Sequence, residues 1–541
     1  MRRIQSLELI IVAGFCGFLF FYGLGNLGLL GPDEPRYAQV AREMLERDDF
    51  ITPTLHGEPW LEKPALYYWR AMLAFDTFGV KDWVARLPSA TFALGMIVVI
   101  FFHMRRFRPG AQLDAALITA SCAAVIGFAR GASTDMQLAA PFTVAMLGWY
   151  AWYETGKKLW LIDLYFFLGI ATLAKGPVAP LMAGGIVVIF CGLRHDLRHS
   201  LRTLWWPGII LYSVITLPWF IAVQMKNPQF IKVFILEHNL ARFSTDTFRH
   251  VQPFWFYVPV LLLSLVPWTF FAAPAMVDAV RSCLKDWRSS KGEERANVDS
   301  FPEYLVIWAA LIVVFFSISR SKLPGYILPA IAPCTILTAD YLQRMHEEHI
   351  HKLVIASHAA LQGILVALAL VFPYFFLQGI PMSRQGVVVA VLLAAAFFAM
   401  IYLTLLKSGV RLLRFVTLLP LILIMGFFLR VAAPTADNYY SARPVAADIQ
   451  KVGPTSSPIA VYKAGRAVWY GLAFYRNQRV FNYEEKEIPG TEHLLVTKAL
   501  AREDLDRVIP GRKRVLLGRF APQKLEYYWV SAVNHSDSST R

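Results

Sequence analysis

The fold class follows from an apolar run at residues 7–30, which reads LELIIVAGFCGFLFFYGLGNLGLL and holds one charged residue, Glu8. About 20 apolar residues are needed for a helix to cross the ~30 Å hydrocarbon core of a bilayer. The run follows Met-Arg-Arg, is too long for the core of a signal peptide and lacks a small-residue cleavage site. We therefore expect a retained membrane helix here.

Twelve further apolar blocks have the length of a spanning helix. They lie near residues 84–104, 111–129, 136–154, 158–174, 177–193, 204–224, 254–276, 303–319, 324–342, 353–377, 386–406 and 412–432. The 541-residue chain is 56% hydrophobic and only 17% charged, whereas a soluble protein carries about 25% charged residues. The sequence predicts a polytopic α-helical membrane protein with thirteen spanning helices.

Basic residues alternate between the connections of these blocks. One set of short connections, which includes Arg2 and Arg3, holds twenty Lys and Arg residues, and the other set holds five. Those five are Arg130, Lys175, Arg320, Lys322 and Arg384. Because cytoplasmic loops are enriched in Lys and Arg, the amino terminus is expected in the cytoplasm and the carboxyl terminus outside. These loops also explain the net charge of +15, and no basic stretch is interleaved with stacking aromatics, so no nucleic-acid partner is expected.

Three longer segments then fall on the outer face, at residues 31–83, 225–253 and 433–541. The first contains apolar residues at helical spacing, which predicts a short amphipathic helix lying along the membrane surface. They are Tyr37, Val40, Ala41, Met44 and Leu45. None of the five cysteines falls in an outer segment, so a disulfide framework is not expected.

The last of these segments differs in character from the apolar blocks. Short β-rich runs occur at 459–462, 468–474, 494–496 and 515–517, separated by polar stretches. We therefore divide the chain into a membrane domain, residues 1–433, and a small outer α/β domain, residues 434–541.

Two adjacent acids, Asp33 and Glu34, stand at the outer exit of the first span in Gly31-Pro32-Asp33-Glu34-Pro35-Arg36-Tyr37-Ala38. In a purely structural reading, Asp33 caps the amphipathic helix and Pro35 occupies its first turn. Alternatively, a carboxylate at this position accepts the proton of an incoming hydroxyl as a general base. The segment alone does not decide between them.

Other ionisable residues of the outer face have more than one interpretation each. Lys63 either extends its ammonium toward water beside aromatic residues or contacts a phosphate. Asp135 either caps the fourth span or takes part in a site. Lys175, with no acid nearby in sequence, needs water or a phosphate. His238 is a metal ligand, a phosphate donor or an interfacial histidine.

These residues come from separate segments that converge on one side of the membrane. The cations are Lys63, Lys175, Arg242, Arg320 and Lys322, and the acids are Asp33, Glu62 and Asp135. Charge gathered at bilayer depth indicates a functional site. An anionic lipid headgroup with an apolar tail would fit it.

At these residues the chain resembles a known family. The landmarks are Asp33-Glu34-Pro35-Arg36-Tyr37-Ala38, Leu61-Glu62-Lys63-Pro64, Thr134-Asp135, Leu173-Ala174-Lys175-Gly176-Pro177, Glu237-His238 with Arg242-Phe243, and Lys322-Leu323-Pro324-Gly325-Tyr326-Ile327-Leu328-Pro329. In this order they are similar to those of the C-type fold glycosyltransferases of the aminoarabinose lipid A transferase and protein O-mannosyltransferase superfamily. The resemblance spans the whole chain and is closest to the bacterial aminoarabinose branch. Ala65 departs from the pattern, where a second proline often follows Glu-Lys-Pro.

The resemblance implies an inverting transfer of a sugar from undecaprenyl phosphate at the periplasmic face of the inner membrane. Asp33 would be the catalytic carboxylate and Asp135 the second acid. The carrier phosphate would be bound by Lys63, Arg242 and Tyr326, with Lys175, Lys322 and Arg320 nearby. Glu62 and His238 resemble a divalent metal pair, which we expect to hold zinc. No Gly-rich phosphate loop is present, so no nucleotide cofactor is expected.

The sugar that the resemblance implies is 4-amino-4-deoxy-L-arabinose, with lipid A as acceptor and a monomer embedded in membrane lipids as the working unit. An alternative is a sister enzyme that uses another polyprenyl-linked sugar, such as mannose, with a protein or O-antigen acceptor. A lipid flippase or transporter is a further alternative, but it would need polar residues near the midplane of several spans. The apolar blocks here are apolar at their centres.

Overall fold

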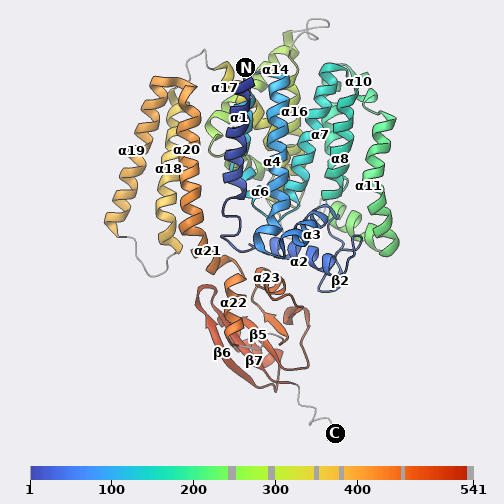
Figure 1. Ribbon diagram of the computed structural model, residues 1–541, viewed down its shortest axis with the longest axis vertical. Helices are drawn as coiled ribbons and strands as arrows, with labels where there is room; N and C mark the ends of the chain where they lie inside the picture. Colours follow the sequence, from blue (N-terminus) through green and yellow to red (C-terminus); the bar gives the residue numbers. More distant parts are fainter. Residues whose placement is uncertain are drawn as a thin grey trace.

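The computed structural model describes residues 2–241, 251–289, 299–345, 352–376, 383–452 and 457–532. A bundle of long helices forms the larger part, and a smaller α/β unit packs against one end of it (Figure 1). The amino terminus lies at the opposite end of the bundle (Figure 1).

The helices of the bundle follow the apolar blocks closely. They are α1 (Arg2–Cys16) with η1 (Gly17–Phe21), α4 (Asp82–Phe107), α5 (Gln112–Ser121), α6 (Ala123–Ala129), α7 (Asp135–Thr155), α8 (Leu159–Lys175), α9 (Val178–Leu193), α10 (Leu197–Arg202), α11 (Trp206–Lys226), η2 (Lys232–Ala241), η3 (Phe254–Phe256), α13 (Tyr257–Ser264), α14 (Thr269–Ser289), α16 (Phe301–Ile318), η4 (Pro324–Ala330), α17 (Ile331–Arg344), α18 (Lys352–Phe376), α19 (Arg384–Ser408), η5 (Gly409–Leu412), α20 (Leu413–Phe427), η6 (Phe428–Ala432) and α21 (Ala433–Tyr440). Lys175-Gly176-Pro177 separates two helices, as expected.

Two of the expected spans are broken. The block 111–129 forms α5 and α6, which are bent by 65° at Cys122. The amide of Ala123 at this break donates to the carbonyl of Val266, 2.8 Å away. Val266 itself lies in the break of the second block, 254–276, which forms α13 and the start of α14. This hydrogen bond between the two breaks satisfies one backbone donor and one backbone acceptor. The length of an apolar run does not predict such a contact.

The first apolar run ends earlier than expected, because η1 stops at Phe21 rather than near residue 30. Arg130 donates to the carbonyl oxygens of Leu19, Tyr22 and Gly23 at 2.9 to 3.0 Å. Gly23 has a φ of +61°, a conformation that ends a right-handed helix readily only with glycine. The guanidinium of Arg130 thus takes up the last carbonyl groups of this helix.

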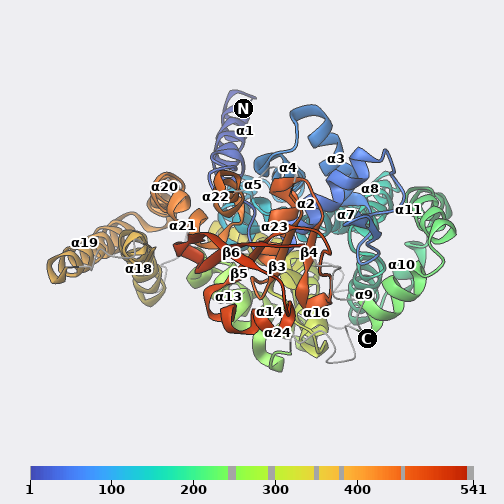
Figure 2. The ribbon, with the colours of Figure 1, turned by 90° about the horizontal axis from the view of Figure 1, so that it is seen from below.

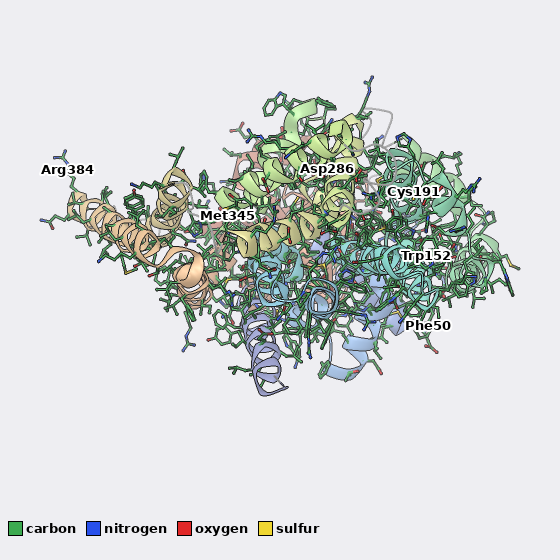
Figure 3. All side chains as sticks on the ribbon, turned by 90° about the horizontal axis from the view of Figure 1, so that it is seen from above. Phe50, Trp152, Cys191, Asp286, Met345 and Arg384 are labelled. Carbon is green, nitrogen blue, oxygen red and sulfur yellow. The ribbon has the colours of Figure 1, made fainter. Side chains whose placement is uncertain are left out.

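By length and composition, seven helices of the described residues could each cross a membrane, or eight if α5 and α6 form one bent span. Three shorter apolar helices accompany them, at Leu7–Phe21, Val178–Leu193 and Phe254–Ser264. Seen from the end that carries the amino terminus, Trp152 and Cys191 lie on one side of the bundle (Figure 3). Arg384, at the start of α19, lies at the far tip of the opposite side (Figure 3).

Two short helices, α2 (Asp33–Glu46) and α3 (Leu66–Phe78), lie across the end of the bundle that faces the α/β unit (Figure 1). The predicted apolar face of α2 is buried at Tyr37, Val40, Ala41 and Met44. Between α2 and α3 a two-stranded hairpin pairs β1 (Thr54–Leu55) with β2 (Glu58–Pro59). The sequence predicted α2 but not α3.

The carboxyl-terminal part is built on one five-stranded sheet of order β4-β3-β5-β7-β6. Its elements are α22 (Arg443–Val452), β3 (Ile459–Tyr462), α23 (Arg466–Arg476), β4 (Val480–Asn482), η7 (Tyr483–Glu485), β5 (His493–Lys498), η8 (Ala499–Asp504), α24 (Leu505–Val508), β6 (Arg514–Phe520), η9 (Ala521–Gln523) and β7 (Leu525–Val530). The β3 strand pairs in parallel with β4 and β5, whereas β5, β7 and β6 pair antiparallel. Three of the four predicted β-rich runs are strands.

The fourth run, 468–474, was predicted as a strand and is wrong: it lies in the helix α23. All seven of its residues are buried. A continuous apolar run has no periodicity that separates a strand from a helix, so its packing decides. Here α23 packs on α2, and the helix starts after Gly465 (φ +88°) and ends at Asn477 (φ +48°).

The α/β unit is joined to the bundle end by polar contacts. Arg443 pairs with Asp437 and Asp82, both at 2.7 Å, and Tyr475 accepts from the amide of Leu29 at 2.7 Å. Figure 2 shows α23 next to α2 from below. Helix α2 therefore lies between the bundle end and the α/β unit and contacts both.

Candidate active site

The two adjacent acids of α2 have different environments. Glu34 forms a 2.6 Å ion pair with Arg86 of α4, and its oxygens also accept from the amides of Leu30 and Ala132 at 2.6 and 2.7 Å. Arg86 is 4% exposed and donates to the carbonyls of three residues of the preceding loop. Those residues are Leu24, Leu27 and Gly28. Glu34 is thus a structural carboxylate that fixes the start of α2.

Asp33 has the opposite character, since its side chain is 57% exposed. It is the first residue of α2 and makes no capping hydrogen bond at the helix start, where Pro32 is the N-cap. Among the described residues, the contact that holds it is an ion pair with Arg36, at 2.6 Å. The carboxylate of Asp33 is therefore held at one oxygen and open to solvent, which suits a general base better than a cap.

Asp135 and Lys175 meet at 2.5 Å, although they are forty positions apart in the sequence. Lys175, for which the sequence suggested water or a phosphate as partner, thus has a carboxylate partner from another segment. The ammonium also lies 5.5 Å from the ring centroid of Tyr326, above its face. Next to Tyr326, a Cβ on Gly325 would come within 2.5 Å of Asp135 Oδ1. Only glycine allows η4 to approach the acid this closely.

Glu62 and His238 lie together, with Oε1 and Nε2 3.8 Å apart. This separation is too long for a hydrogen bond and fits two ligand bonds of about 2.0–2.2 Å to a shared zinc ion. The described residues contain no group of three or more His, Cys, Asp or Glu side chains that could hold a metal. An ion here would be held by Glu62 and His238, with water or phosphate oxygens in its remaining positions.

The three pairs belong to one region. Burial raises the pKa of Tyr37, and the nearby charges of Arg36, Asp33, Asp135 and Glu62 act on the same hydroxyl. Tyr37 therefore lies among the acids from three different segments. Gly176, directly after Lys175, lies close to the helix that carries His238, because a Cβ on Gly176 would come within 2.5 Å of the ring of Phe234 in that helix.

The other site residues predicted from the sequence lie in the turn before η4, beside Glu62 or outside the described residues. Lys322 is 6% exposed and donates to the carbonyls of Ser319 and Gln252, at 2.5 and 3.1 Å, so its ammonium holds the turn before η4 instead of facing a ligand. Arg320 is exposed in the same turn, and Lys63 follows Glu62 directly. Arg242 lies outside the described residues.

Sequence reasoning missed the roles of Glu34, Arg86 and Arg36. The Glu34–Arg86 pair could have been anticipated from the sequence, because an arginine within the first turns of an apolar block needs a partner. Arg36 lies outside the apolar set that the sequence predicts for this helix. In the structure it is 12% exposed, because the α/β unit covers it.

Known proteins are similar to this chain in sequence and in fold. The dolichyl-phosphate-mannose-protein mannosyltransferase family matches residues 11–234, which include Asp33, Glu62, Asp135 and Lys175. An undecaprenyl phosphate-α-4-amino-4-deoxy-L-arabinose arabinosyl transferase of Serratia proteamaculans is 30% identical over 351 residues, 63% of this chain and 60% of its own length. The protein of the same name from Shewanella sediminis is 27% identical over 399 residues, 70% of this chain and 67% of its own length.

The chain is similar in sequence to these transferases. ArnT from Cupriavidus metallidurans, solved with undecaprenyl phosphate bound, has the same fold, with a TM-score of 0.77 over 97% of this chain and 98% of its own. The two sequences are 22% identical. A more distant likeness, with a TM-score of 0.51 and 11% identity, links the fold to the archaeal oligosaccharyltransferase AglB from Archaeoglobus fulgidus. The resemblance predicted from the motifs is confirmed, as is a helical membrane fold.

Proposed function

We propose that the protein is an inverting glycosyltransferase that moves 4-amino-4-deoxy-L-arabinose from undecaprenyl phosphate to lipid A. The observation that carries the proposal is the exposed carboxylate of Asp33, which lies in one region with the Asp135–Lys175 and Glu62–His238 pairs. The choice of donor and sugar is supported by the similarity to the aminoarabinose transferases.

The chemistry requires charge stabilisation on one side of the sugar and a base on the other. As the glycosidic bond breaks, the lipid phosphate leaves with negative charge, which Lys63, Lys175 and Arg242 would stabilise. Tyr326 would orient a phosphate oxygen, since its ring lies against the Lys175 ammonium. Asp33 would accept the acceptor proton on the opposite face, so the configuration inverts in one displacement.

Asp135 has a positioning role in this scheme. Its ion pair with Lys175 fixes the ammonium toward the site, and the pair is only 21% and 13% exposed. Glu62 and His238 would hold a divalent ion such as zinc, which would supply further positive charge to the phosphate when bound.

We further propose that the protein sits in the bacterial inner membrane with thirteen spans, as a monomer. The site and the carboxyl-terminal unit would then face the periplasm, where the α/β domain would comprise residues 434–541. The excess of basic residues in the alternate connections supports this orientation. It also places the α/β unit on the side where the donor sugar and lipid A are exposed.

The test is headgroup analysis of lipid A from cells with and without the gene, followed by transfer with the purified protein. Purified protein, undecaprenyl-phosphate aminoarabinose and lipid A should yield modified lipid A, and the Asp33→Asn variant should not. Transfer of mannose from its polyprenyl phosphate to a protein or O-antigen would favour the sister activity. Movement of lipid between leaflets without a new glycosidic bond would favour a flippase.

A further inference from the structure

The side chain of Arg36 joins the candidate catalytic acid to the carboxyl-terminal unit. One nitrogen of its guanidinium pairs with Asp33 at 2.6 Å. The guanidinium carbon lies 5.2 Å from the ring centroid of Tyr37, 5.1 Å from that of Trp60 and 5.7 Å from that of Tyr470. These three rings, here called the Arg36 cage, come from α2, the following loop and α23.

The cage is desolvated, which strengthens the attraction between a cation and ring faces. Tyr37 and Tyr470 are 5% exposed each, and the Arg36 side chain is 12% exposed. Burial raises the pKa of Tyr470, and the positive charges of Arg36 and Arg466 oppose this rise. The pKa of Arg36 is raised by its neighbours Tyr37, Asp33 and Glu62, although burial acts in the opposite direction. The guanidinium thus remains charged inside the cage.

The carboxylate of Asp33 is weakly anchored. Its side chain is more than half exposed, and within the described part of the chain its ion-pair partner is Arg36. The rotamer of the carboxylate therefore depends on where the guanidinium sits. Since Tyr470 belongs to α23, the position of the guanidinium depends in turn on the docking of the α/β unit.

We propose that Tyr470 is a positioning residue for the transfer reaction, acting from the carboxyl-terminal unit through Arg36 on the carboxylate of Asp33. This inference rests on the proposed function, because it takes Asp33 as the base. It assigns the carboxyl-terminal unit a part in building the active site.

The chain offers a matched control in the same helix. Phe474 of α23 packs its ring 5.3 Å from the guanidinium carbon of Arg42, one turn and a half further along α2. This second contact resembles the first in chemistry and lies in the same interface. Arg42 pairs with Glu46 and donates to the carbonyl of Phe474, and it takes no part in the ion pair of Asp33.

The experiment compares Tyr470→Leu, Tyr470→Phe and Phe474→Leu with the wild type in the full-length protein in detergent. Loss of one desolvated cation–ring contact predicts a fall in kcat of about five- to thirty-fold for Tyr470→Leu, with the donor KM unchanged. Tyr470→Phe keeps the ring face and should stay within about three-fold of the wild type. Phe474→Leu should also retain wild-type kcat.

A second readout is independent of transfer. Phenylglyoxal modification of Arg36, followed by mass spectrometry, should increase in Tyr470→Leu and remain at the wild-type level in the other two variants. Equal losses of kcat in Tyr470→Leu and Phe474→Leu, or an unchanged Arg36 modification, would overturn the proposal. If the wild type transfers no sugar while the modification pattern is as expected, the proposed function fails and the cage is only a packing feature.

Discussion

Replacing each of the two adjacent acids of α2 by its amide separates catalysis from folding. The Asp33→Asn change preserves shape and keeps an oxygen that can accept from Arg36. Because Asp33 is 57% exposed, its ion pair resembles surface pairs, which contribute about 0.2–1 kcal/mol. A positioned base contributes about 10²- to 10⁴-fold to a rate. We therefore expect near-native stability and a kcat lowered at least about a hundred-fold.

The neighbouring Glu34→Gln change should do the reverse. Glu34 is 12% exposed, and Arg86 would lose the charge that compensates it. Breaking a buried pair from one side costs about 3–5 kcal/mol. This variant should be markedly less stable and give less folded protein, while the molecules that fold retain much more activity than Asp33→Asn.

The assay measures initial transfer rates per folded molecule, with folded protein quantified by size-exclusion chromatography, and apparent Tm in the same detergent. Retention of more than about a tenth of wild-type activity by Asp33→Asn would refute its role as base. An Asp33→Asn variant that is as destabilised as Glu34→Gln would show that Asp33 is structural after all.

Three further outcomes are expected. Lys63→Ala and Arg242→Ala should each weaken binding of undecaprenyl phosphate about ten- to hundred-fold, because each loses a charge-assisted hydrogen bond of about 1.5–3 kcal/mol. A binding titration that shows unchanged affinity for both variants would show that neither residue binds the phosphate. His238→Ala should lower zinc occupancy measured by elemental analysis, as should Glu62→Gln, and equal zinc content in wild type and variants would exclude the shared site. Burial lowers the pKa of His56 below its usual 6.5, so the unfolded state binds more protons below that pH, and the apparent Tm should fall as the pH drops through this range. The decrease should be smaller in His56→Phe, and parallel pH profiles of the two proteins would contradict it.

The motifs nominated the residues of the candidate site, because chemistry-bearing residues in outer segments are conspicuous against apolar blocks. Glu62 and His238, which the resemblance paired, lie 3.8 Å apart. Lys175 shows the limit: sequence neighbours offered no partner, and Asp135 reaches it only because α7 begins where α8 ends. Short-range sequence carries no information on contacts closed by the packing of two helices.

The sequence by itself determined the membrane class, the apolar helices and the amphipathic character of α2, since these depend on hydrophobic length and period. Only the tertiary structure decided which acid is structural and which is open. Both acids are adjacent and chemically alike, but Arg86 approaches one of them from α4. The tertiary structure likewise made 468–474 a helix and buried Arg36, because both lie where α23 meets α2. The helices α2 and α23 are more than 400 residues apart in the sequence, so the stabilisation from their contact cannot be inferred from the local pattern of either segment.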